Sequence, residues 1–350
     1  MRTRSRVRAM RGLEGLPLPA RDEVVRLLRP ADALCSLPFV SKGTLVALQE
    51  LCMPLGKVNA RTVDEALQQA HALRRAWDLG TLRLDSYVRD VSGLAGCAAL
   101  HTLNLSRTRV SDVSGLGRCA ELRTLSLYMC RELTDASALG RCAALHTLDL
   151  SYCSQVTDVS ALAGCATLHT LRLMNCENLM MLPACAALHR LYLSDAHELT
   201  DVSALAGCPN LRALTLLECG SVRDVSVLAS CAALRRLVLH GTSVADVSAL
   251  VSCTALRACS LMCTGVTDVS PLAGCTALHR LELAFCRGVT DVSALAGCAT
   301  LHTLDLRYCR GLTDVSALAG CATLHTLLLR GTWVTDVSAL GGLAGLRGPL

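Results

Sequence analysis

Leucine residues recur along most of the chain in one fixed arrangement, Leu-x-x-Leu-x-Leu, which returns every 20 to 23 residues. The arrangement begins at these positions: Leu79, Leu100, Leu122, Leu145, Leu168, Leu188, Leu211, Leu234, Leu256, Leu278, Leu301, Leu324 and Leu346. Alternating apolar residues over so short a run are typical of a β-strand with one buried face. Similar strands at a nearly constant period predict a stack of equal layers, not one globular core.

A polar motif separates these strands, as in Val-Thr-Asp-Val-Ser-Ala-Leu at residues 156–162. Asp and Ser at the start of a short helical turn can accept hydrogen bonds from free backbone N–H groups. We therefore interpret the recurrent Asp as a structural cap and not as a catalytic carboxylate. The Asp recurs at Asp90, Asp112, Asp135, Asp158, Asp201, Asp224, Asp246, Asp268, Asp291, Asp314 and Asp336.

The combined repeat carries a family resemblance. A period of about 20–29 residues with Leu-x-x-Leu-x-Leu is the leucine-rich-repeat signature. VTDVSALAGCATLHTL, residues 156–171, resembles the repeats of internalins and phosphatase regulators, and its wording is most similar to the leucine-rich-repeat proteins of trypanosomatid parasites. The resemblance implies an α/β leucine-rich-repeat solenoid, or horseshoe, over residues 78–350. We expect about twelve repeats, with parallel short strands on the concave face.

The first 77 residues lack the repeat. Residues 1–12 contain five arginines, and we expect a disordered basic tail there. Residues 13–77 show helical apolar spacing, and Thr62 with Glu65 forms a capping-box pattern. We therefore expect a helical N-terminal cap that covers the first layer of the solenoid.

Part of this cap also resembles a degenerate F-box. Leu18-Pro19, Pro30 to Leu34 and Val40-Ser41-Lys42 follow the F-box order, although the Trp usual after the Lys is missing. The resemblance implies that an adaptor of a cullin-RING ubiquitin ligase would dock on the following residues: Val24, Leu28, Leu34 and Val40.

The 21 cysteines bear on the cellular compartment in which we expect the protein. Most of them occupy repeat positions, and the N-terminus carries no apolar export signal, so we expect reduced thiols and a cytoplasmic protein. A straight ladder of thiols does not converge on one tetrahedral centre, so we expect no metal and no cofactor. The net charge of +5 is dispersed and no long apolar run occurs, so we expect neither nucleic-acid nor membrane partners.

The variable positions of the strands point to a binding surface. Aromatic residues make up only 3% of the chain, and most of them fall at or just after the strands. Aromatic residues and arginine are the usual anchors of protein interfaces. The candidates for contact with a protein partner on the concave face are Tyr128, Asp149, Tyr152, Arg172, Tyr192, His240, Glu282, Phe285, Asp305, Arg307, Tyr308 and Arg330.

No phosphate loop, metalloprotease motif or nucleophile elbow occurs, so we expect no enzyme. Three functions stay open: a protein-binding scaffold, which we favour; an F-box-type substrate receptor of a ubiquitin ligase; and a secreted or surface adhesin or effector like the internalins. The chain ends at the start of a further strand. Self-association through an uncapped C-terminal edge and a truncated sequence are both compatible with that ending.

Overall fold

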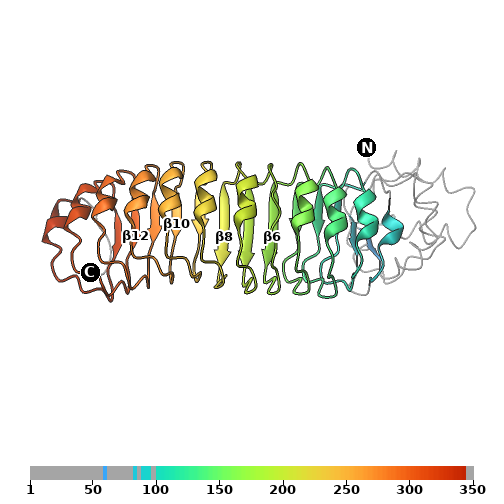
Figure 1. Ribbon diagram of the computed structural model, residues 1–350, viewed down its shortest axis with the longest axis horizontal. Coiled ribbons are helices and arrows are strands. Elements are labelled where there is room, and N and C mark those ends of the chain that lie inside the picture. Colours follow the sequence, from blue (N-terminus) through green and yellow to red (C-terminus); the bar gives the residue numbers. More distant parts are fainter. Residues whose placement is uncertain (1–57, 61–81, 85–87, 96–99, 344–350) are drawn as a thin grey trace, which may run out of the picture. The chain divides into compact units, whose positions relative to one another are not determined.

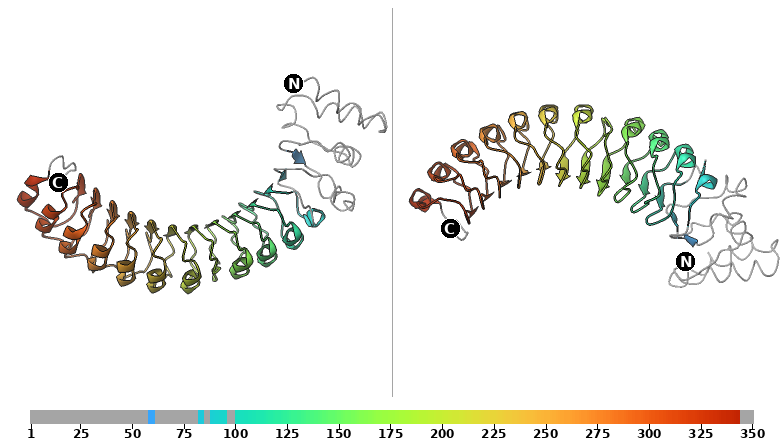
Figure 2. Two further views of the ribbon diagram at one scale, coloured as in Figure 1. Left: turned by 90° about the horizontal axis from the view of Figure 1, so that it is seen from above. Right: turned by 60° about the horizontal axis from the view of Figure 1, so that its bottom comes forward.

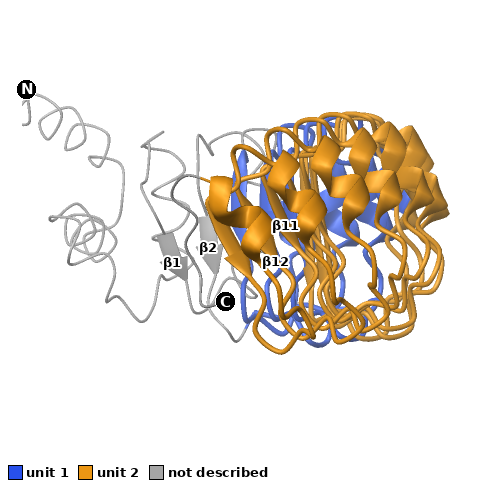
Figure 3. Cartoon of the chain, turned by 90° about the vertical axis from the view of Figure 1, so that its left-hand side faces the viewer, with its two compact units in different colours: residues 1–156, 161–168 blue, residues 157–160, 169–350 orange. Residues whose placement is uncertain are grey.

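The computed structural model describes residues 58–60, 82–84, 88–95 and 100–343 (Figure 1). These residues fall into two compact units (Figure 3). Residues 1–156 and 161–168 belong to unit 1, and residues 157–160 and 169–350 belong to unit 2. No described helix is long and apolar enough to cross a membrane.

Unit 1 contains five short strands. They are β1 (Val58–Ala60), β2 (Leu82–Leu84), β3 (Thr102–Asn104), β4 (Thr124–Ser126) and β5 (Thr147–Asp149). Each pairs in parallel with the next, so sequence order is also spatial order. The connections carry 3-10 helices: η2 (Ser92–Leu94), η3 (Ser114–Arg118), η4 (Ser137–Arg141) and η5 (Ser160–Gly164), whose first residue belongs to unit 2.

Unit 2 continues the same arrangement with eight strands. They are β6 (Thr170–Met174), β7 (Arg190–Ser194), β8 (Ala213–Leu217), β9 (Arg236–Val238), β10 (Ala258–Ser260), β11 (Arg280–Glu282), β12 (Thr303–Asp305) and β13 (Thr326–Leu328). The 3-10 helices are η6 (Ser203–Gly207), η7 (Ser226–Ser230), η8 (Ser248–Ser252), η9 (Ser270–Gly274), η10 (Ser293–Gly297), η11 (Ser316–Gly320) and η12 (Ser338–Gly342). The parallel register keeps equivalent residues side by side across steps of different length, as in Arg236 with Ala258 and Thr303 with Thr326.

The strands of each unit line the inner side of its bend, and the 3-10 helices line the outer side (Figure 2). Leu, Val and Cys side chains fill the space between, and nearly all of those in the regular layers are at most 2% exposed. Burial of each such side chain contributes about 1.5–3 kcal/mol relative to exposure. The predicted leucine-rich-repeat solenoid is thus confirmed, and its helical turns are 3-10 helices.

The Asp-x-Ser motif caps every one of these turns. The backbone N–H of each Ser donates to Oδ1 of the Asp two residues earlier, at 2.7–2.8 Å, from Asp90 to Asp336. Among the fully described layers, the one between β6 and β7 lacks the motif and has no 3-10 helix, and Met180 and Met181 are exposed there.

The N-terminal segment needs one correction. Val58–Ala60 lies within residues 13–77, where we expected a helical cap, yet it forms β1 and pairs with β2. Leu55, Val58 and Ala60 repeat the Leu-x-x-Leu-x-Leu spacing with smaller side chains, which concealed the strand. The rest of the predicted tail and cap lies outside the described residues.

Candidate functional site

The strand face consists of two sets of side chains. The first set alternates with the buried leucines on the strands. The second set comprises the side chains that are not buried among the four residues after each strand. In β6, Leu171 and Leu173 are buried while Arg172 between them is exposed. Each of the twelve candidate partner-binding residues lies on the strand face of its own unit. The four candidate adaptor-binding residues, Val24, Leu28, Leu34 and Val40, lie outside the described residues.

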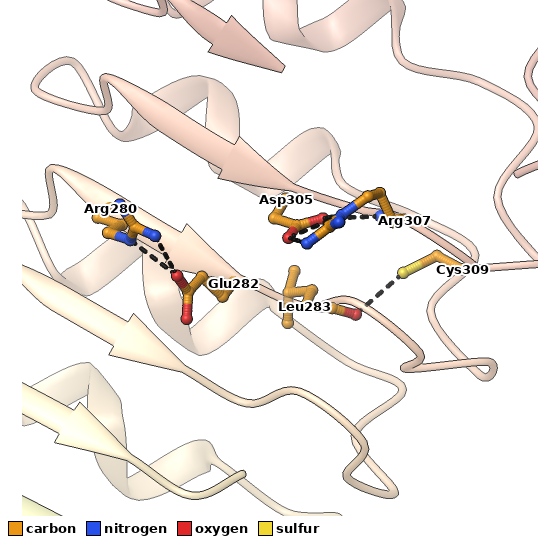
Figure 4. A network of polar contacts seen from close by, with 6 residues as sticks. All are labelled: Arg280, Glu282, Leu283, Asp305, Arg307 and Cys309. Atoms are coloured by element: carbon orange, nitrogen blue, oxygen red, sulfur yellow. Dashed lines mark hydrogen bonds and ion pairs between the residues drawn. The ribbon is translucent and has the colours of Figure 1, made fainter. Parts of the chain in front are cut away.

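Two ion pairs occupy the strand face of β11 and β12 (Figure 4). Arg280 Nε lies 2.8 Å from Glu282 Oε1, and Arg307 Nη2 lies 2.6 Å from Asp305 Oδ2. The hydrogen bonds to Asp305 and its charge raise the pKa of Arg307. Both carboxylates are therefore neutralised within the chain.

Asp149 and Asp305 also shape the backbone. Asp149 Oδ1 accepts a hydrogen bond from the N–H of Ser151 at 2.9 Å, and Asp305 Oδ1 accepts one from the N–H of Arg307 at 3.1 Å. Asp305 is only 5% exposed. These two candidates thus hold the turn at the end of the strand, and a partner reaches Asp305 only at its edge.

Just after the strands, one residue per repeat adopts a left-handed backbone conformation, with φ between 54° and 78°. We call these residues the left-handed column. It comprises Arg107, Met129, Tyr152, Asn175, Asp195, Glu218, Gly241, Cys263, Phe285, Tyr308 and Gly331. Most backbone N–H groups of the column donate to a carbonyl of the next repeat and so extend the sheet ladder; that of Tyr308 donates to the carbonyl of Arg330 at 2.9 Å. Only Gly adopts this conformation without a steric cost, which for other residues is about 1–2 kcal/mol.

Aromatic residues of the strand face lie in pairs. The rings of Tyr128 and Tyr152 are 5.3 Å apart and nearly perpendicular, whereas those of Phe285 and Tyr308 are 4.6 Å apart and nearly parallel. In unit 2 the guanidinium of Arg172 lies over the ring of Tyr192, 5.8 Å from its centroid. Contacts of this kind hold exposed rings in one orientation.

Imidazole rings form a second stack at the start of the strands. His302 stacks on His279 at 5.2 Å and on His325 at 5.5 Å. Nδ1 of His302 lies 2.6 Å from the carbonyl oxygen of Thr300, which fixes that nitrogen as the N–H donor when the ring is neutral. Farther along the face, His240 Nε2 lies 3.4 Å from Glu218 Oε1.

The thiols lie in the interior. Of the described cysteines only Cys263 is exposed, and none forms a disulfide. Cys309 donates its S–H to the carbonyl of Leu283 at 3.1 Å, whereas Thr332 at the equivalent position donates to Leu329 of its own repeat at 2.7 Å. Within the described residues no group of three His, Cys, Asp or Glu side chains could hold a metal ion.

A shallow hollow interrupts the strand face over β9 to β11. Its volume is about 310 Å³, and its lining includes Ala258, Cys259 and Ser260 of β10 together with Arg236 and Arg280 of the neighbouring strands. Small residues of β10 beside long ones of its neighbours create it. Neither this hollow nor the left-handed column was predicted, although Gly241, Gly331, Asn175 and Asp195 in one column are the residue types that favour positive φ.

Comparisons with known proteins agree with this geometry. The family model named Leucine Rich repeat matches residues 297–319. No curated protein matches the chain significantly.

Solved structures show a similar architecture. The internalin InlF from Listeria monocytogenes is 20% identical, with 96% of this chain and 98% of that one covered and a TM-score of 0.60. The functional domain of InlJ from Listeria monocytogenes, which includes a cysteine ladder, is 18% identical, with 88% of this chain and 64% of that one covered and a TM-score of 0.62. TLR13, solved in complex with ssRNA13, is 17% identical, with 86% of this chain and 54% of that one covered and a TM-score of 0.56.

These identities establish a shared fold and leave the ligand open. The repeat, the parallel strands and the structural similarity together show that the chain folds as a leucine-rich-repeat solenoid with cysteine-containing repeats, similar in architecture to the internalin structures.

Proposed function

We propose that the chain is a non-catalytic module that binds a protein partner along its strand face. The leucine-rich-repeat fold supports protein–protein interaction in general. The observation that supports this face is the contrast within each repeat: the buried positions are nearly uniform, whereas the strand face varies and carries exposed Tyr152, Phe285 and Arg172.

The geometry is suited to recognition and not to chemistry. The recurrent Asp and Ser are engaged as turn caps, and the carboxylates of Glu282 and Asp305 are paired with arginine. The described thiols are buried, with the exception of Cys263. Rings held by stacking lose little conformational freedom when a partner binds, which favours affinity. Three further statements stay predictions: that the chain is an F-box-type substrate receptor of a ubiquitin ligase, that it is a secreted or surface adhesin or effector, and that it is cytoplasmic.

A capture experiment tests the proposal. Tagged full-length chain is used to purify partners, which are quantified by mass spectrometry for the wild type and for the double variant Arg172→Ala/Tyr192→Ala. The control is Val251→Ala, because Val251 is 54% exposed on η8, on the opposite side of its layer.

We expect partners whose recovery falls at least tenfold with the strand-face variant and is unchanged with Val251→Ala. If the strand-face variant keeps every partner of the wild type, the assignment of the binding surface is wrong.

A further inference from the structure

We propose that Phe285 and Tyr308 anchor an acidic segment of a protein partner that inserts an aromatic or large aliphatic side chain between flanking arginines. This inference rests on the proposed function and narrows it to one place and one partner chemistry. We call Phe285 and Tyr308 the aromatic ridge.

The backbone is the first argument. Phe285 and Tyr308 have φ of 65° and 61°, whereas the same column contains Gly at Gly241 and Gly331. The column therefore accepts glycine, and aromatic residues stand in it against a steric preference. The turn therefore requires the positive φ but not the rings, so the two aromatic side chains are free to serve the surface.

The fit of the ridge into its surroundings is the second argument. The two rings are stacked at 4.6 Å, and Phe285 remains 42% exposed. A Cβ on Gly331 would lie 2.5 Å from Cδ1 of Tyr308, so the glycine leaves the space that this ring occupies. One face of the pair is supported from within the chain, and the rings are presented in a fixed orientation.

The surrounding charges give the partner's chemistry. Arg287 and Arg310 each follow a ridge residue by two positions, and both are exposed. Arg330 is also exposed, and its carbonyl accepts the N–H of Tyr308, which places it beside the ridge. Among the described residues, none of these three arginines forms an ion pair.

The nearby carboxylates do not offset this charge. Asp305 is paired with Arg307 and Glu282 with Arg280, so neither compensates the three arginines. The complementary ligand is therefore acidic. A single-stranded nucleic acid would also combine stacking with negative charge, but the two ion pairs interrupt the positive potential along the strands that a phosphate backbone would follow. The pattern favours a protein segment.

Peptide selection tests the inference with the full-length chain. A random 12-residue display library is selected on the immobilised wild type, and the dissociation constants of enriched peptides are measured by fluorescence anisotropy, with oligouridine as a competitor. We expect peptides with Asp or Glu around one aromatic or leucine residue, whose affinity falls as salt is added.

The variants Phe285→Gly and Tyr308→Gly should each weaken these peptides at least tenfold, and Arg287→Glu with Arg310→Glu should do the same. Glycine suits the backbone at both ridge positions, so thermal melting should show a folded protein. Val251→Ala is the control, because Val251 is exposed on η8, on the opposite side of its layer from the strand face. It should leave the affinity unchanged.

The inference is wrong if no peptide is enriched, if the enriched peptides are basic, or if oligouridine binds more tightly than any peptide. It is also wrong if the peptides are lost on Arg172→Ala/Tyr192→Ala and not on the ridge variants; in that case the strand face as the binding surface still stands.

Discussion

Tyr308 shows how one residue can serve the sheet and the surface at once. Its N–H extends the parallel ladder, its positive φ turns the chain away from the strand, and its ring stacks on Phe285. The conformation costs about 1–2 kcal/mol for a residue with a Cβ. In the left-handed column, a side chain on the surface therefore comes at the cost of some conformational stability.

Substitutions in this column should shift stability in opposite directions. We expect Gly331→Ala to lower the free energy of unfolding by about 1–3 kcal/mol, because the new Cβ meets both the positive φ and the ring of Tyr308. Arg107→Gly should raise it by about 0.5–1 kcal/mol, since it relieves φ of 64° at an exposed position. Urea unfolding of both variants measures the difference. Equal effects of the same sign would show that backbone strain does not govern this column.

At this scale the sequence predicts positions better than conformations. The candidates Tyr152, Phe285 and Tyr308 are recognisable as non-repeating residues beside a strand. Their positive φ is not, because an aromatic residue gives no sign of it; only Gly241 and Gly331 in the same register do. The internal role of Asp305 depends on Arg307 folding back onto it, which is a side-chain contact that no periodicity encodes.

At the scale of the element, each 3-10 helix depends on its Asp. The backbone N–H of Ser203 and its hydroxyl donate to Asp201 and lower the pKa of that carboxyl, and the same contacts lower the pKa of Asp224, Asp268, Asp291 and Asp314. A carboxyl whose pKa is lower in the folded state adds stability above its ordinary pKa of 3.8 and loses it as the pH falls through the folded value.

Thermal melting should therefore report an acid-labile turn. We expect the melting temperature to decline as the pH drops below about 4, and Asp201→Ala to lower it at pH 7 because Ser203 loses its acceptor. Asp201→Asn is the control: it keeps an oxygen acceptor but removes the titrating group. If Asp201→Asn melts as low as Asp201→Ala at pH 7, the cap does not act through its hydrogen bond.

Element types were predictable because two spacings are so regular. Leu-x-x-Leu-x-Leu marks the strands and Asp-x-Ser marks the 3-10 helices, and both follow from local physical preferences. The strand β1 was missed because Val58 and Ala60 stand where the repeat has leucine, which weakened the sequence pattern below recognition.

At the scale of the whole molecule, the buried cysteines make the stability of the fold depend on pH in the alkaline range. Burial raises the pKa of Cys142, Cys275 and Cys309 to about 12, and that of Cys253 and Cys298 to about 11, from an ordinary value of 9.0. Because the folded state binds these protons more tightly, its advantage is complete below pH 9 and is lost as the pH rises toward the folded values.

Urea unfolding at increasing pH should show this loss. We expect the free energy of unfolding to be constant up to about pH 8 and to fall steadily above pH 9 as several thiols ionise in the unfolded chain. Alkylation of native protein at pH 8 is the companion measurement, in which Cys263 should be the first of the described cysteines to be modified. Uniform alkylation of all the repeat cysteines in folded protein would contradict their burial.

The constant register has a consequence for how such a surface can change. Strands separated by 20, 22 or 23 residues pair equivalent positions alike, as Thr170 with Arg190, Arg236 with Ala258 and Thr303 with Thr326 show. A gene that gains, loses or exchanges a whole repeat in frame therefore reorders the outward side chains while the interior meets the same neighbours as before. The binding specificity of such a surface depends on the order of its repeats, so recombination of whole repeats can change the specificity while the packing of the core stays the same.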